Sequence, residues 1–143
     1  MAVIGFTFDR INIERKKAPK GNIKITHQMN IKSIKEQEVE IEKGKKVLDF
    51  TFEFKADYSP NIAEMEFVGR VHYVEEDKKA KEILKEWEKN KKIDPKIMAV
   101  IVNMAFHRSL LEALDLSRVI NVPPVIPLPI LSPKSDKAEN YIG

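Results

Sequence analysis

The sequence contains no cysteine, few glycines and no long apolar run. The absence of cysteine excludes a disulfide framework, a thiolate metal site and a cysteine nucleophile. The five glycines are too far apart to build a phosphate-binding loop, and no G-x-S-x-G motif is present. Because no stretch of about 18 residues is apolar, and no signal peptide is recognisable at the N-terminus, we expect a cytoplasmic protein without membrane insertion.

The chain does contain many charges of both signs. Its 25 lysines and arginines face 22 aspartates and glutamates, which gives a formal net charge of +3. A length of 143 residues and a hydrophobic content of 43% suffice for one domain with its own core. Lysines interspersed with glutamates usually form a solvated surface, so nucleic acid is not an expected partner despite the basic pI.

Alternation of apolar and polar residues predicts four strands in the first half of the chain. In the first strand the alternation slips near Asp9-Arg10, which predicts a bulge. Turn residues at 42–45 and 59–61 separate the later strands. The apolar rows of the four strands run through residues 4–13, 23–41, 48–58 and 63–73.

Two helices are predicted after the strands. A charged helix around residues 75–92 has one apolar stripe, made of Ala80, Ile83, Leu84 and Trp87. Asp94-Pro95 provides a cap and a first turn for a second helix over 97–116. Its first half is apolar nearly all round, so we expect it to be buried against both the sheet and another subunit.

These patterns predict an α+β fold, with a four-stranded antiparallel sheet followed by helices packed on one face. We expect a single domain spanning residues 1–143, with a mobile polar tail at 132–143. No catalytic centre can be assembled from this sequence. His27, His72 and His107 each lack a second ligand at metal-binding spacing. We therefore expect a binding protein, not an enzyme, with no catalytic residues, no metal and no cofactor.

The segment Val119–Leu131, hereafter the Pro-rich segment, reads VINVPPVIPLPIL. Its four prolines forbid a helix interior or a central strand, yet most of its other residues are aliphatic. Two interpretations stay open. The segment either packs over the sheet as a buried lid or lines an apolar groove that accepts polypeptide segments.

The order of these parts resembles the SecB-type preprotein chaperones. Phe6-x-Phe8-Asp9-Arg10-Ile11 is similar to the opening strand of that family, and Ala18-Pro19 matches its crossover loop. Residues 22–73 supply the remaining strands of its four-stranded sheet. The stretch 94–118 looks like its long helix, and the Pro-rich segment, with Asn121–Pro124 at its centre, resembles its apolar helix-connecting loop.

The resemblance implies an ATP-independent chaperone, a holdase that keeps clients unfolded, with a role in protein export. It also implies a homotetramer, a dimer of dimers, and unfolded or nascent polypeptides as partners. Carried onto this chain, the client-binding wall would consist of Val119, Ile120, Val122, Val125, Ile126 and Leu128. Replacing Val122 and Ile126 by Asp is then expected to abolish client binding without unfolding the protein.

The chain also departs from the family pattern. Arg15, Lys16 and Lys17 precede Ala18-Pro19, where bacterial members carry acidic residues that dock the SecA motor. The charged helix around 75–92 has no counterpart in those members. These departures count against SecA docking and indicate a divergent branch of the family, for which an archaeal origin is one interpretation.

Two alternative functions stay open. A nucleic-acid-binding module would expose the Phe50, Phe52 and Phe54 stripe for base stacking, although Asp49 and Glu53 flank it. A binding module for one dedicated partner protein would use the same apolar surface as the holdase.

Overall fold

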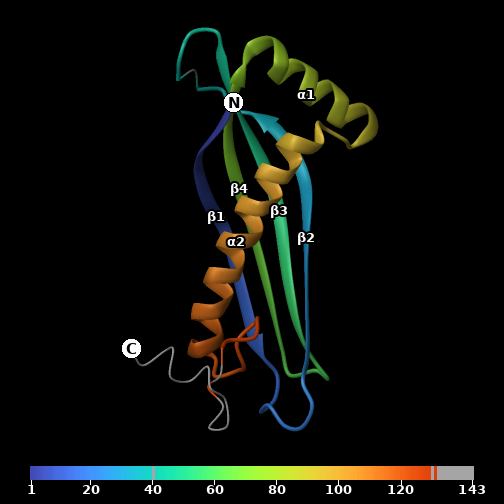
Figure 1. The fold of residues 1–143 in the computed structure, drawn as a ribbon, viewed down its shortest axis with the longest axis vertical. Helices are drawn as coiled ribbons and strands as arrows, with labels where there is room; N and C mark the ends of the chain where they lie inside the picture. The colour runs from blue at the N-terminus through green and yellow to red at the C-terminus, as the bar shows by residue number, and fades with distance from the viewer. Residues whose placement is uncertain (40, 130, 132–143) are drawn as a thin grey trace.

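The computed structural model describes residues 1–39, 41–129 and 131. Four antiparallel strands, β1 (Ala2–Arg15), β2 (Lys24–Glu36), β3 (Lys45–Ser59) and β4 (Ala63–Glu76), form one sheet. The strand order is β1-β4-β3-β2, so β1 and β2 are the edges. Two helices, α1 (Asp77–Asn90) and α2 (Pro95–Val119), lie on one face of the sheet (Figure 1). The predicted α+β architecture is confirmed.

The core lies between the helices and the two central strands. Every second residue of β3 points toward the helices, and Phe50, Phe52 and Phe54 are fully buried there. Burial of this phenyl row stabilises the fold by removing a large apolar surface from water. It also removes the structural basis of the nucleic-acid module considered above, because these rings are inaccessible to bases.

The strand predictions hold in the centre of the sheet and fail at one end. The predicted bulge is present as a register shift between Phe8 and Arg10, opposite β4. The second strand was predicted to reach residue 41, but β2 ends at Glu36. Val39 and Ile41 are exposed outside the strand. The ladder with β3 stops where Glu36 meets Leu48, although β3 itself continues to Lys45. One further bond, from the Gln37 N–H to the Val47 carbonyl at 2.9 Å, follows the end of β2.

Helix α1 lies across one end of the sheet, where β4 leads into it (Figure 1). Its predicted apolar stripe is confirmed: Ala80, Ile83 and Trp87 are buried, and Leu84 is partly buried. The helix ends at Lys91, which adopts a left-handed conformation (φ 56°) and donates its backbone N–H to the Trp87 carbonyl at 2.8 Å.

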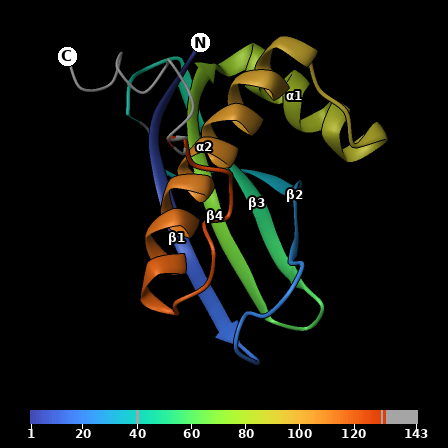
Figure 2. The same ribbon diagram turned by 60° about the horizontal axis from the view of Figure 1, so that its bottom comes forward.

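Helix α2 crosses the sheet obliquely (Figures 1 and 2). The Asp94 side chain caps it by accepting from the Lys96 backbone N–H at 2.9 Å, as predicted. The residues that α2 buries recur at every fourth position: Ile97, Ile101, Ala105, Ser109, Ala113 and Ser117. A four-residue spacing drifts by about 40° per step around a helix of 3.6 residues per turn, so the contact line winds around α2.

In the described part of the chain nothing covers the other side of α2. Val100 in its first half and Leu111 in its second half are exposed there, so the described residues bury the apolar first half on one side only. By length and composition α2 is apolar enough to cross a membrane. In this fold it lies along the sheet, with its buried side chains in the core.

Candidate functional site

The Pro-rich segment starts where a Schellman motif ends α2. Asn121 adopts the left-handed conformation (φ 57°), and its N–H bonds to the Arg118 carbonyl at 3.3 Å. The Val122 N–H then reaches back to the Ser117 carbonyl at 3.0 Å. This pair of bonds is the usual helix stop with Gly or Asn in the left-handed position. It reverses the chain and directs the following prolines back over the sheet.

A buried tyrosine fixes the segment in that position. The hydroxyl of Tyr58, a fully buried residue of β3, donates to the Pro123 carbonyl at 2.6 Å. Burial raises the pKa of Tyr58 to about 12, so the phenol remains a donor at any physiological pH. Val122 and Val125 point into the core on either side of this bond and are 8% and 2% exposed. The segment is thus anchored by one hydrogen bond and two buried side chains.

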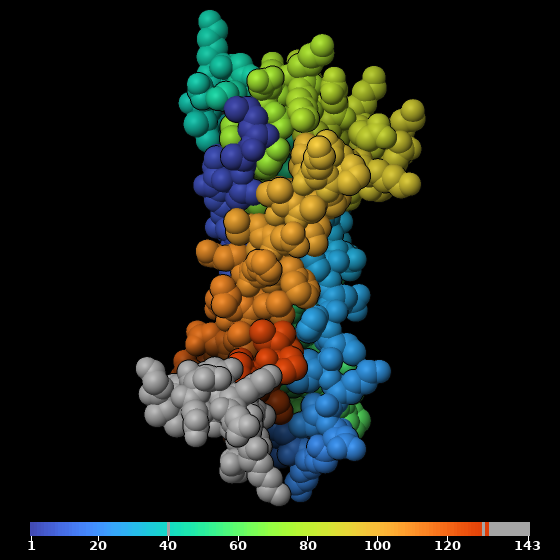
Figure 3. All heavy atoms as spheres, viewed as in Figure 1, coloured from blue at the N-terminus to red at the C-terminus, as the bar shows by residue number. Residues whose placement is uncertain are grey.

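An apolar groove of about 430 Å³ lies between this segment and edge strand β2. Figure 3 shows the segment, in red, against the blue residues that lead into and form β2. Ile25 reaches the groove because it pairs with Tyr58 and so points to the helix side of the sheet. The groove is lined by Ile25, His27 and the six consecutive residues from Pro123 to Leu128.

Among the described residues, none that lines the groove is charged, and His27 is the one titratable side chain in the lining. The imidazole of His27 packs beside two phenyl rings that also contact each other. Its centroid is 5.4 Å from that of Phe106 on α2 and 6.4 Å from that of Phe54 on β3. Such a surface can take up apolar and aromatic side chains by burial and stacking. It offers no nucleophile and no paired acid and base.

The structure separates the six predicted wall residues into three groups. Val125, Ile126 and Leu128 line the groove. Val122 belongs to the core beneath the groove. Val119 is the last residue of α2 and Ile120 is its cap, and neither lines the groove. Some side chains of the segment thus form a lid over the core and others form the wall of a groove. That the groove accepts polypeptide segments stays a prediction.

One expectation needs correction. Asp at position 122 would place a carboxylate where the side chain is 8% exposed, and an unpaired buried charge destabilises a fold strongly. The double replacement of Val122 and Ile126 by Asp would therefore test folding, not binding.

Sequence reasoning missed the strand side of the groove. Ile25 and His27 belong to the apolar row of β2, but which side that row faces depends on its pairing with β3. The prolines at 123, 124 and 127 do more than break helix and strand, because all three line the groove.

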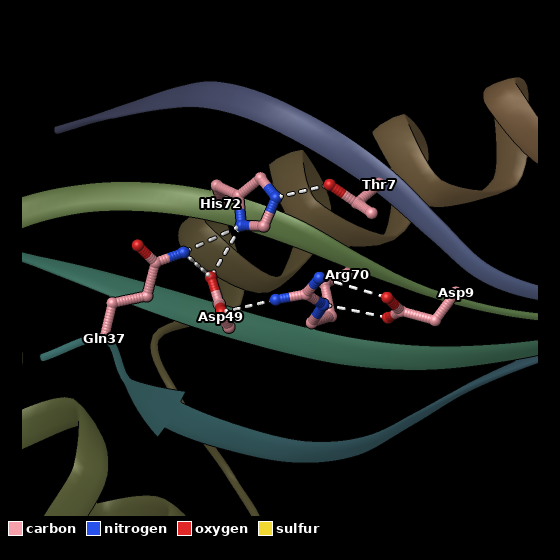
Figure 4. A network of polar contacts seen from close by, with 6 residues as sticks. All are labelled: Thr7, Asp9, Gln37, Asp49, Arg70 and His72. Carbon is pink, nitrogen blue, oxygen red and sulfur yellow. Dashed lines mark hydrogen bonds and ion pairs between the residues drawn. The ribbon is translucent and has the colours of Figure 1, made fainter. Parts of the chain in front are cut away.

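A second cluster of polar side chains lies on the sheet face away from the helices (Figure 4). His72 Nδ1 is 2.6 Å from Asp49 Oδ1, and His72 Nε2 is 2.8 Å from Thr7 Oγ1. Because an ionised carboxylate can only accept, Nδ1 is the donor of the bond to Asp49. Arg70 bonds Asp49 at 3.3 Å and forms a two-point ion pair with Asp9 at 2.8 and 3.0 Å.

This network ties three strands together at the bulge of β1. Asp9 is the extra residue of that bulge, and its pairing with Arg70 holds the bulge against β4. Gln37 covers Asp49 by donating from Nε2 at 2.7 Å. Sequence spacing could not find a partner for His72, because Asp49 and Thr7 come from other strands. Among residues 1–39, 41–129 and 131 no group of three or more His, Asp or Glu is placed to hold a metal ion.

Comparison with known proteins gives a likeness at the level of the fold. No protein-family model matches the chain, and no curated protein matches its sequence. A solved structure does match: the SecB-like chaperone Rv1957 of Mycobacterium tuberculosis, in complex with a ChAD peptide from the Rv1956 HigA1 antitoxin. The match has a TM-score of 0.53 at 12% identity and covers 94% of this chain and 92% of that one. It shows that this chain has a SecB-like fold.

Proposed function

We propose that the protein is a holdase that binds non-native polypeptide segments in the groove between β2 and the Pro-rich segment. The observation that carries this proposal is the groove itself: an apolar hollow whose described lining residues are all uncharged or imidazole, with a wall that Tyr58 anchors. The SecB-like fold supports the same function, since the matched neighbour is a chaperone with a bound peptide. Nothing in this mode of binding requires catalysis or ATP.

Binding would follow from burial of apolar area, at roughly 25 cal/mol per Å². That contribution is non-directional, so clients of different sequence can use the groove. Because β2 is an edge strand, backbone groups along its outer edge can pair with an extended client lying in the groove. The two contributions together select extended, apolar segments, which folded proteins keep inside.

An aggregation assay tests this function. A chemically unfolded, unrelated protein is diluted into buffer with and without an excess of this protein, in the absence of nucleotide. We expect suppression of light scattering that persists at high salt, because apolar burial is not screened. If scattering is unchanged for several unrelated clients, the general holdase function is wrong.

A dedicated partner is the second candidate, and one observation favours it. The matched SecB-like chaperone is bound to a peptide from a single antitoxin. If this chain works in the same way, one peptide should bind it far more tightly than the unfolded test clients do. Competition between a peptide library and an unfolded client distinguishes the two functions.

We further propose that the chain works as a homotetramer, a dimer of dimers. Val100 and Leu111 on the outer side of α2 and Ile4 and Ile11 on edge strand β1 are exposed aliphatic residues. In a tetramer, a neighbouring subunit would cover these residues and so bury the outer side of α2. Light scattering that gives a monomeric mass at micromolar concentration would contradict this assembly.

The place of this chain in the cell is part of the same proposal. A cytoplasmic holdase of a divergent SecB-like branch could pass clients to export. The basic residues at 15–17 argue against an acidic docking surface for SecA at that position.

A further inference from the structure

The exposed side of α1 carries lysines in a single row. Lys78, Lys81, Lys85 and Lys89 follow one another at intervals of three or four residues and are all exposed. Their row, the lysine stripe, lies opposite the buried Ala80, Ile83 and Trp87. At 1.5 Å per residue the stripe is about 16 Å long.

The net charge of the chain is concentrated in this region. Residues 77–96 contain eight lysines and five acidic residues, a net charge of +3 that equals the formal charge of the whole chain. In the described part of the chain Lys81 is the only stripe lysine with an ion pair, to Asp77 at 4.0 Å. The ammonium groups are therefore available to an anionic partner.

The narrow shape of the lysine stripe favours a linear polyanion over a broad anionic surface such as a membrane. The apolar side of α1 is packed on the sheet, so the helix cannot insert into a lipid surface as an amphipathic anchor does. Glu82 and Glu86 border the stripe on one side and Glu88 on the other. A broad anionic surface would meet these carboxylates as well as the lysines, whereas one strand of phosphates can follow the lysines alone.

We propose that the lysine stripe binds the phosphate backbone of single-stranded nucleic acid without sequence preference. This site is separate from the groove: α1 lies at one end of the molecule and the Pro-rich segment at the other (Figure 1). A client and a nucleic-acid strand can thus be held at the same time. The inference stands on the charge and geometry of α1 and does not depend on the holdase function.

The test is fluorescence anisotropy of labelled oligouridylate and oligothymidylate of about 20 nucleotides, titrated with the full chain at several salt concentrations. Four phosphate contacts on a single strand predict a slope of log K against log salt of about −2.8, or about a 50-fold loss between 50 and 200 mM salt. Both oligonucleotides should bind, since the contacts are to the backbone.

A matched pair of variants locates the site. K78Q/K81Q/K85Q/K89Q removes the stripe with a residue that also favours helices. K17Q/K20Q/K24Q/K35Q removes the same charge from exposed positions elsewhere. We expect the first variant to lose binding and its salt slope, and the second to stay within about threefold of the unchanged chain at equal salt. The half-variants K78Q/K81Q and K85Q/K89Q should each lose about half of the slope, which keeps the test valid if the fourfold variant folds poorly.

Three results would overturn the proposal. They are no binding of either oligonucleotide, equal losses in the two fourfold variants, and binding of phosphatidylglycerol vesicles or polyglutamate without binding of oligonucleotides. Client suppression by the stripe variant should be unchanged, so a failure here is distinguishable from a failure of the holdase function.

Discussion

Replacing Ile126 and Leu128 by serine should weaken client binding by about one order of magnitude or slightly more. Leu128 is 51% exposed and Ile126 is partly buried, and both line the groove. Burying a whole aliphatic side chain contributes about 1.5–3 kcal/mol, so covering the exposed half of Leu128 contributes about 0.8–1.5 kcal/mol and covering the smaller exposed part of Ile126 about 0.5 kcal/mol. The sum, about 1–2 kcal/mol, corresponds to roughly a 5- to 30-fold increase in Kd.

The assay is an anisotropy titration of a labelled, permanently unfolded protein, such as reduced and carboxymethylated α-lactalbumin. The matched control is V39S/I41S. These two aliphatic residues are 66% and 61% exposed, beyond the end of β2 that is farther from the groove. The control removes as much exposed apolar surface, and we expect its Kd to stay within about twofold of the unchanged chain.

The outcome refutes the assignment if the two double variants weaken binding equally, because general surface hydrophobicity would then explain the affinity. Unchanged binding in I126S/L128S would also refute it. Thermal unfolding of each variant shows whether a loss of binding reflects a loss of structure, and Ile126 and Leu128 should affect stability much less than Val122 does.

Three further predictions concern the scaffold of the groove. Gly69→Ala should lower the free energy of unfolding by about 1–3 kcal/mol in urea denaturation, because the added Cβ would lie 2.7 Å from the buried Phe52 ring; an unchanged midpoint would contradict the packing described. Ser109→Ala should raise that free energy by about 1 kcal/mol, since the Ser109 hydroxyl is fully buried with no hydrogen-bond partner in the described part of the chain; a loss of stability would show that the hydroxyl has one. Tyr58→Phe should cost about 1–2 kcal/mol at neutral pH by leaving the Pro123 carbonyl unpaired. Since burial raises the pKa of Tyr58 to about 12 while an unfolded tyrosine titrates near 10, the stability that its protonated form contributes is complete below pH 10 and is lost as pH rises toward 12; the Phe variant should lose less over that window.

The sheet could be predicted from the sequence because its signal is local and redundant. The row that contains Phe50, Phe52 and Phe54 alternates without interruption, and only one side of such a strand can face a core. Even the bulge was visible, since an extra residue shifts the apolar positions after Asp9 by one. The end of β2 was not visible, because Val39 and Ile41 continue its apolar positions although they lie outside the ladder and are exposed.

The groove was only half predictable, because contacts between distant residues decide it. The composition of the Pro-rich segment indicated an apolar surface. Which of its side chains turn inward depends on the left-handed turn at Asn121 and on the bond from Tyr58 to Pro123. Those two partners are 65 residues apart in the chain, and no periodicity connects them. The same holds for the network around His72, whose neighbours come from other strands.

The strand order has a consequence for how the chain acquires its structure. β2, β3 and β4 are neighbours in sequence and can form by successive hairpins, whereas β1 pairs only with β4, where Ala2 meets Val74 and Arg15 meets Ala63. Closing so long a loop costs conformational entropy before any contact compensates for it. We therefore expect β1 to pair with β4 only after β2, β3 and β4 have formed their part of the sheet. During synthesis the first strand to be made is then the last to be paired. Its apolar residues remain open until β4 has been made, so while it is being synthesised this protein resembles the clients that we propose it protects.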